Sequence, residues 1–322
     1  MDTTVYVVDE RLGAEGRYAL AAGLAQDGGR VVSVGPAPAR CPQADVVTDV
    51  QDVLGVLERT RWPVRWGGEA TAVRCWSPTA LRHAAGLARR NRCPLTLHLP
   101  SAEAAAGIDL SRWANQFAKD NLSFRVTVPA SPSAWRLLTR GLPPRAVAVL
   151  PPAELPVPPD WHDPCTRDAH RQRARRALGV ADAERLIVAP DEMAPAAGLK
   201  YAVWAHAILR HITPAVRLCM PTAGPYEAAV RDFAAAAGFL DEMLLPRSDV
   251  SATDALSAAD AVVFVREDDL GLTMPATART MNLPIVATAT PDMRAFLATH
   301  GVFVPPKDPR QLTTALLKML AI

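Results

Sequence analysis

The sequence predicts an α/β protein made of two doubly wound domains, each with a parallel sheet, facing each other across a cleft. The chain has 322 residues, more than one hydrophobic core usually spans. In both halves, apolar runs of strand length alternate with helix-length segments, the pattern of β-α-β units. Residues 151–164 are so rich in proline that they can hold neither a helix nor a central strand. We therefore expect an N-terminal domain at 1–150, a stiff linker at 151–164 and a C-terminal domain at 165–322.

The first half shows this alternation from its start. The β-branched run Thr4–Val8 precedes a Gly-containing turn, and Arg17–Gln26 then has the pattern of a helix that stops at a pair of glycines. Pro78–Asn91 is a further helix, with its proline near the first turn, where a missing N–H costs least. The remaining strands of this half are expected at Val31–Val34, Val73–Trp76, Leu95–Leu99 and Arg125–Val128.

After the linker, a helix that ends near Leu178 opens a second alternating series. Its strands are expected at Leu186–Ala189, Val216–Met220, Met243–Leu245, Ala261–Val265, Ile285–Ala287 and Val302–Val304. An acidic loop, which runs from Glu267 towards Thr277, follows one of these strands. Ligands of parallel sheets bind at the carboxyl ends of the strands, so this loop is expected to hold functional residues.

The composition excludes several classes of function. A net charge of +2 gives no strong field for nucleic acid or a membrane surface, and the arginines between Arg167 and Arg176 are expected on a solvated helix face. The five cysteines are widely spaced and form no CxxC pair, which supports neither a zinc site nor a disulfide framework. The start of the chain has no basic leader, and no apolar run reaches membrane-spanning length. A cytoplasmic protein without a transmembrane segment is expected.

Several motifs, taken together, resemble the GT-B-fold glycosyltransferases of family 4, also called glycosyl transferases group 1. They stand in the family's order, and the prolines fall at its usual interdomain link. The motifs are Leu95–His98, Arg176–Gly179, Ala258–Ala261, Leu283–Thr288 and Val304–Pro309. The resemblance implies two Rossmann-like domains, with the acceptor on the N-terminal side and a sugar nucleotide on the C-terminal side. It also implies hexosyl transfer with retention of configuration, without a metal and with no cofactor beyond the nucleoside-diphosphate sugar itself.

The chain departs from the family at the positions that would face the donor diphosphate. As the glycosidic bond breaks, negative charge grows on the diphosphate, and the family provides an arginine and a lysine for it. Here Pro190 and Ala197 take those places. Asp191 and Glu192 directly follow Pro190, and their negative charges would repel a diphosphate. Lys200, three residues beyond Ala197, is the remaining candidate for a cation.

The carboxylates that would hold the sugar and the ribose are also altered. Asp269 takes the first acidic position, whereas Thr277 replaces the second and can offer only one hydroxyl. The backbone N–H groups of Gly271, Leu272 and Thr273 are expected at a helix N-terminus, where an anion could still bind. A helix start that is merely capped by a neighbouring aspartate is an equal alternative. The acidic loop could also hold a metal, but a solvated loop is favoured.

In the first half, His98 ends a strand and resembles the family histidine that approaches the reacting sugar. A strand-end histidine bonded to backbone is the alternative. The turn with Gly13 and Gly16 could present N–H groups to a phosphate, although an ordinary turn between a strand and a helix explains it equally well. Trp62 and Trp66 could stack on a sugar or pack in a core or an interface.

The residues thus favour a glycosyltransferase-like protein with a degraded donor site, a catalytically weak or silent subunit that acts with a protein partner or as a homo-oligomer. An active, divergent retaining glycosyltransferase is the alternative, with His98, Lys200 and Asp269 as its surviving catalytic residues. A nucleotide- or sugar-binding module of different chemistry is a third hypothesis. The donor base, the sugar and the acceptor are not encoded in any motif of the sequence.

Overall fold

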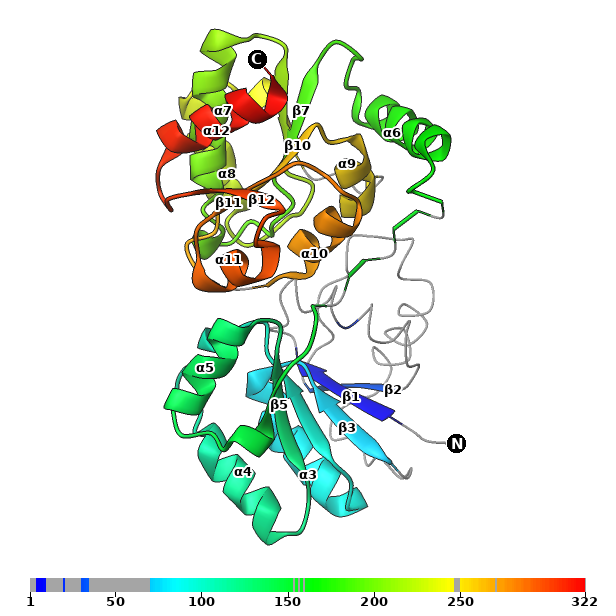
Figure 1. Ribbon diagram of the computed structural model, residues 1–322, viewed down its shortest axis with the longest axis vertical. Helices are drawn as coiled ribbons and strands as arrows, with labels where there is room; N and C mark the ends of the chain where they lie inside the picture. The colour runs from blue at the N-terminus through cyan, green and yellow to red at the C-terminus, as the bar shows by residue number, and fades with distance from the viewer. Residues whose placement is uncertain are drawn as a thin grey trace. The chain divides into compact units, whose positions relative to one another are not determined.

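The structure, a computed structural model, describes residues 4–9, 20, 30–34, 70–152, 154–155, 157–158, 160–245, 250–269 and 271–321. The chain divides into two compact units (Figure 1). The first comprises Met1–Ala153 with Leu270–Leu272, and the second comprises Glu154–Asp269 with Thr273–Ile322. Gly13, Gly16, Trp62 and Trp66 lie outside the described residues, as does most of the helix expected at 17–26.

The first unit contains a parallel sheet with the strand order β2-β1-β3-β4-β5-β6. Its strands are β1 (Thr4–Asp9), β2 (Arg30–Val34), β3 (Ala72–Cys75), β4 (Leu95–His98), β5 (Phe124–Val128) and β6 (Val147–Val149). The first five confirm the strands predicted from the sequence. The edge strand β6 was not predicted, because it has only three residues and lies close to Pro143 and Pro144.

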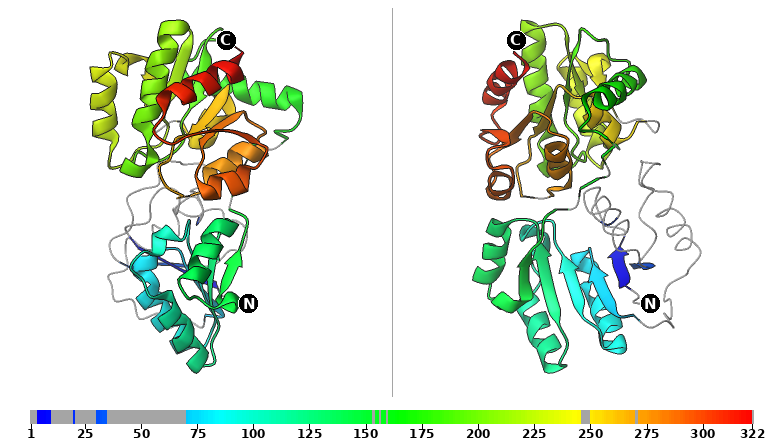
Figure 2. Two further views of the ribbon diagram at one scale, coloured as in Figure 1. Left: turned by 60° about the vertical axis from the view of Figure 1, so that its left-hand side comes forward. Right: turned by 45° about the vertical axis from the view of Figure 1, so that its right-hand side comes forward.

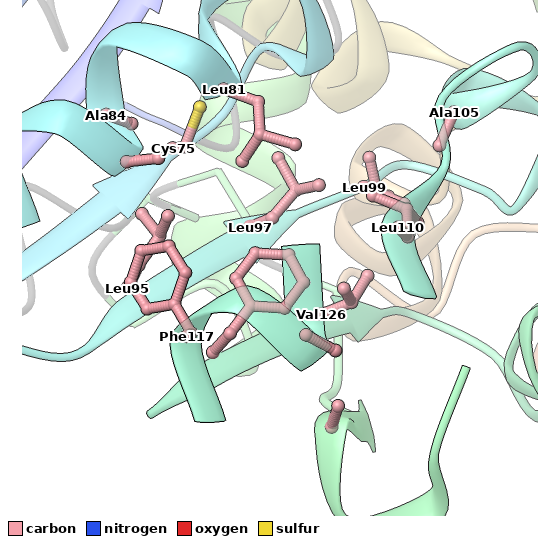
Figure 3. Close-up of a cluster of buried hydrophobic side chains, with 14 of the residues drawn as sticks. Cys75, Leu81, Ala84, Leu95, Leu97, Leu99, Ala105, Leu110, Phe117 and Val126 are labelled. Carbon is pink, nitrogen blue, oxygen red and sulfur yellow. The ribbon is translucent and has the colours of Figure 1, made fainter. Parts of the chain in front are cut away.

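Helices α3 (Leu81–Asn91), α4 (Leu110–Lys119) and α5 (Ser131–Thr139) belong to this unit. The predicted helix at 78–91 begins with a 3-10 turn, Pro78–Ala80, before α3. Figure 3 shows how Leu81 from α3 and Phe117 from α4 point towards Leu95 and Leu97 on β4. All four side chains are buried, and burial of one such side chain contributes roughly 1.5–3 kcal/mol.

The second unit contains a parallel sheet with the strand order β12-β11-β10-β7-β8-β9. Its strands are β7 (Arg185–Val188), β8 (Val216–Cys219), β9 (Met243–Leu244), β10 (Ala261–Phe264), β11 (Ile285–Thr288) and β12 (Gly301–Val304). All six agree with the predicted strands to within one residue at each end. Two doubly wound parallel sheets confirm the fold class that the sequence predicts.

Helices cover both faces of this second sheet (Figures 1 and 2). They are α6 (Pro164–Leu178), α7 (Leu199–Ile212), α8 (Glu227–Ala236), α9 (Ala252–Ala258), α10 (Thr273–Thr280), α11 (Pro291–Leu297) and α12 (Pro309–Leu320). Helix α7 packs against α8 and α12 on one face, and α6 packs against α9 on the other. In the part of the chain that the structure describes, none of the helices is both long and apolar enough to span a bilayer.

Asp260 anchors α6 to the amino end of β10. Its carboxylate accepts hydrogen bonds from Arg171 at 2.7 Å, from Arg175 at 3.1 Å and from the N–H of Leu186 at 2.7 Å. Arg175 is only 5% exposed and also donates to the carbonyl oxygens of residues 181 and 184. The prediction that the arginines between residues 167 and 176 lie on a solvated face is therefore wrong for Arg171 and Arg175, because both turn towards this carboxylate.

The segment after residue 153 packs on α10. The N–H of Leu155 donates to the Thr277 hydroxyl oxygen at 2.9 Å, and the indole Nε1–H of Trp161 donates to the carbonyl oxygen of Met281 at 2.9 Å. Leu155 and Trp161 are both buried. This part of the proline-rich segment is thus tied to the second unit.

Candidate functional site

The strand order of the second sheet marks one place as its natural ligand-binding point. Strands β7 and β10 are neighbours, but β7 leads through α7 to β8 on one side, whereas β10 leads through α10 to β11 on the other. In doubly wound sheets, ligands bind outside the carboxyl ends of the strands at the point where the connections diverge in this way. We call this place the switch point.

A buried ion pair lies at the switch point. The Nε atom of Arg266, two residues beyond β10, lies 3.1 Å from Oδ1 of Asp191, three residues beyond β7. The side chains of Arg266 and Asp191 are 9% and 3% exposed. Thr288, at the end of β11, donates through its hydroxyl to the carbonyl oxygen of Arg266 at 2.6 Å. Residues that follow or end neighbouring strands thus hold both the side chain and the backbone of Arg266.

Asp269, the predicted sugar-binding carboxylate, caps a helix. Its Oδ1 accepts a hydrogen bond from the N–H of Asp292 in the first turn of α11, at 3.0 Å. The residue that precedes this helix, Thr290, makes no capping bond with its own side chain. Asp269 is 8% exposed and joins the loop after β10 to the start of α11. A carboxylate at this position is also favoured by the positive end of the helix dipole.

Glu267 holds the same loop in two further ways. Its N–H donates to the carbonyl oxygen of Ala196 at 2.9 Å, and its carboxylate pairs with Lys307 after β12 at 2.9 Å. The pairing with Glu267 raises the pKa of the Lys307 ammonium, which therefore stays charged. The Lys307 side chain is 59% exposed, so the pair contributes little to stability.

The turn that leads into α7 contains Ala197 and Gly198, and Lys200 lies in the first turn of the helix. Gly198 has a φ of +65°, and a Cβ atom added to it would lie 2.1 Å from the carbonyl oxygen of Val265, just beyond β10. Ala197 is buried and has no polar group to offer. Lys200 is exposed, with its Nζ 5.0 Å from the ring centroid of Tyr201. The turn therefore packs closely against β10, and Lys200 lies on the surface of α7.

Thr277 is completely buried, and its hydroxyl is engaged with backbone. The oxygen accepts from the N–H of Leu155 at 2.9 Å, and the proton is donated to the carbonyl oxygen of Thr273 at 2.9 Å. Gly271 has a φ of +81°, and Leu272 and Thr273 are buried where α10 begins. The predicted helix start is therefore present, and the hydroxyl of Thr277 is used within the second unit.

His98 lies in the first unit, at the carboxyl end of β4. Its Nδ1 is 2.7 Å from the hydroxyl oxygen of Thr127, its neighbour across the sheet on β5. Its ring stacks on Trp76, which follows β3, with ring centroids 4.3 Å apart and planes inclined by 14°. These contacts orient the imidazole at the edge of the sheet where ligands of such sheets bind.

The structure thus brings Asp269, Gly271, Leu272 and Thr273 into one loop and helix start, places Thr277 in the following turn, and leaves Lys200 on another helix. Sequence reasoning missed three residues that complete these contacts: Arg266, Thr127 and Trp76. Arg266 follows a predicted strand, Trp76 ends one and Thr127 is the last residue but one of another, so a position near a strand end was a signal that could have found them. Asp191, expected to repel a diphosphate, has its charge balanced by Arg266.

No family model and no curated protein matches the sequence. Solved structures with a similar fold, however, match nearly the whole length of the chain. Anabaena HepE, crystallised with UDP and glucose, is 16% identical over 98% of this chain and 89% of its own, with a TM-score of 0.68. A glycosyltransferase from Rickettsia africae is 12% identical over 100% and 89%, with a TM-score of 0.69. Sucrose-phosphate synthase from Thermosynechococcus elongatus is 13% identical over 99% and 90%, with a TM-score of 0.62.

At these identities, the likeness concerns the fold and carries no assignment of substrate. The solved structures include a glycosyltransferase, and this chain covers 89% or 90% of each of the three. The chain therefore has the GT-B glycosyltransferase fold.

Proposed function

We propose that the protein is a glycosyltransferase-like protein of the family 4 type with a degraded donor site. In this view it is catalytically weak or silent and acts as a subunit with a protein partner or with a second copy of itself. The observation that carries the proposal is the ion pair at the switch point. The guanidinium of Arg266, which could neutralise a donor diphosphate there, is paired with the carboxylate of Asp191.

The charges of the surrounding loops support the same conclusion. In the described loops that follow β7, β8, β10, β11 and β12, carboxylates outnumber cations, and both cations, Arg266 and Lys307, are paired with carboxylates. A departing diphosphate needs uncompensated positive charge, and loss of one transition-state contact of this kind costs about 3 kcal/mol. The expected rate of sugar transfer is correspondingly low.

The groups that would hold the sugar and the ribose are also engaged elsewhere. Asp269 caps α11, and the hydroxyl of Thr277 bonds to the backbone of residues 155 and 273. Both side chains have roles in stability that explain their presence without catalysis. A subunit that keeps the fold and has lost its chemistry would retain such residues.

Turnover measurements test the proposal directly. The purified protein is incubated with a panel of nucleoside-diphosphate sugars, and both transfer and donor hydrolysis are measured, alone and with any copurifying protein. We expect no release of nucleoside diphosphate above background. Lys200→Ala should leave this result and any biological activity unchanged, as should the control Lys318→Ala on α12. Donor turnover that falls in Lys200→Ala but not in Lys318→Ala would overturn the proposal.

Two observations favour the active, retaining hexosyltransferase as a second candidate. His98 is held at a strand end by Thr127 and Trp76, and Arg266 places a guanidinium at the switch point. Under this alternative, His98→Ala would abolish donor turnover, and Thr127→Val would lower kcat by weakening the orientation of the imidazole. The same assays decide between the two candidates, because only the active enzyme gives a rate that these variants can lower.

A further inference from the structure

We infer that Asp191 is a built-in substitute for a ligand anion, and that Arg266 is a latent binding site for a phosphoryl group of a nucleoside diphosphate. Asp191 keeps this site occupied. The inference rests on the proposed function, because it gives the physical reason why the donor site of this chain would not bind diphosphate well.

The position of the pair is the first argument. Strands β7 and β10 are hydrogen-bonded neighbours, and the connections that follow them diverge to opposite sides of the sheet. A ligand of a doubly wound sheet is expected at this point. The pair between Asp191 and Arg266 lies there, and both side chains are at least nine-tenths buried.

The rigidity of the arginine is the second argument. The hydroxyl of Thr288 donates to the carbonyl oxygen of Arg266 at 2.6 Å, and the N–H of the next residue, Glu267, donates to Ala196 at 2.9 Å. Backbone on both sides of the Arg266 side chain is therefore fixed by neighbouring elements. The base of the Arg266 side chain should therefore stay beside the switch point when its carboxylate partner is removed, so that the guanidinium can still reach an anion there.

The third argument is that the backbone next to Asp191 holds its carboxylate in place. The carbonyl oxygen of Pro190 accepts a hydrogen bond from the hydroxyl of Thr222 at 2.9 Å, which fixes the chain just before Asp191. A tethered carboxylate competes with a free anion at high effective concentration. Guanidinium groups bind carboxylates and phosphates through the same fork of N–H donors. A diphosphate could therefore take the place of Asp191 only by displacing it.

The experiment compares variants of the full chain by calorimetry and thermal denaturation, with UDP, inorganic pyrophosphate and uridine as probes. Asp191→Ala removes the charge and opens its space, and Asp191→Asn removes the charge alone. Glu192→Ala is the matched control, because it removes the same charge one residue away. The double variant Asp191→Ala/Arg266→Gln removes both partners.

We expect Asp191→Ala to bind UDP and pyrophosphate at least about tenfold more tightly than the wild type, a change of about 1.4 kcal/mol. Uridine should show no gain, since it carries no phosphate. The gain should vanish in the double variant and be absent in Glu192→Ala. If Asp191→Ala does not fold, Asp191→Asn should be stabilised by pyrophosphate more than the wild type is, because it removes the carboxylate charge that pairs with Arg266.

The inference is overturned if folded Asp191→Ala or Asp191→Asn shows no gain, or if Glu192→Ala shows the same gain. Failure of the proposed function would give a different experimental result. In that case the wild type itself binds UDP tightly and turns over a sugar nucleotide, whatever Asp191→Ala does.

Discussion

The N–H of Leu155 donates a hydrogen bond to the buried hydroxyl of Thr277 at 2.9 Å, and this hydroxyl donates a hydrogen bond of its own to the carbonyl oxygen of Thr273. The contact joins the first residues of the second unit to α10, across 122 positions of the chain. Thr277 therefore has a structural role that its place in the sequence motif does not reveal.

Thr277→Val should destabilise the protein by about 1–3 kcal/mol, because the buried N–H of Leu155 loses its acceptor. Thr277→Ser keeps the hydroxyl and should cost less. Urea denaturation measures both variants. If Thr277→Val were as stable as the wild type, the hydrogen bond to Leu155 would contribute nothing.

Arg175→Met should destabilise the second unit by about 3–5 kcal/mol, because it leaves the carboxylate of Asp260 short of a partner and strips donors from several carbonyl oxygens. The next residue, Arg176, is exposed, so Arg176→Met is a matched control that should change stability by less than about 0.5 kcal/mol. Chemical denaturation tests the difference. Equal losses in the two variants would contradict the role of Arg175 as an anchor.

Gly198→Ala should destabilise the protein by more than Gly179→Ala. Both glycines have a positive φ, +65° and +67°, so both substitutions carry a backbone cost of about 1 kcal/mol. Only at Gly198 would the new Cβ meet another atom, the carbonyl oxygen of Val265. Thermal denaturation of the two variants separates the effect of the contact with Val265 from the backbone cost of the positive φ. Equal melting temperatures would show that the turn can move away from β10.

His206 should make stability fall at mildly acid pH. Its burial on α7 lowers the pKa of the imidazole below the usual 6.5, although a hydrogen bond to the carbonyl oxygen of Val216 opposes the shift. The unfolded chain therefore takes up the proton first, so the stabilisation is complete above about pH 6.5 and is lost as the pH falls below that value.

The free energy of unfolding, measured by urea denaturation at several pH values, should fall below pH 6.5 by up to about 1.4 kcal/mol per pH unit for this one group. His206→Gln removes the titrating ring and should flatten the curve. His300→Gln removes an exposed histidine and should leave the slope unchanged. An unchanged slope in His206→Gln would contradict the role assigned to His206.

The strands of both sheets could be predicted because apolar runs and turn residues are local signals. Strand β6 was missed, since three residues carry too little of any such signal. The GT-B fold was inferred from motifs in the right order, and the solved structures bear it out. Assignment to family 4 and the loss of activity remain proposals.

The contacts of the site were much harder to predict than the strands. Arg266 and Asp191 lie 75 positions apart in sequence, and only the strand order, which places β10 beside β7, brings them together. The burial of Arg175 depends likewise on Asp260, which belongs to another element. Local patterns carry no information on such pairs. The roles predicted for His98, Lys200 and Asp269 stay predictions until activity is measured.

Strand β10 has a charged pair beyond each of its ends, Asp260 with Arg175 before it and Arg266 with Asp191 after it, and every residue between is buried. Neither end can fray without exposing a charge that has lost its partner. Amide hydrogen exchange should therefore be slowest at the centre of this strand, at Val262 and Val263, and should occur there only through global opening of the second unit. The amides of β10 are then the last in the second unit to become accessible to solvent.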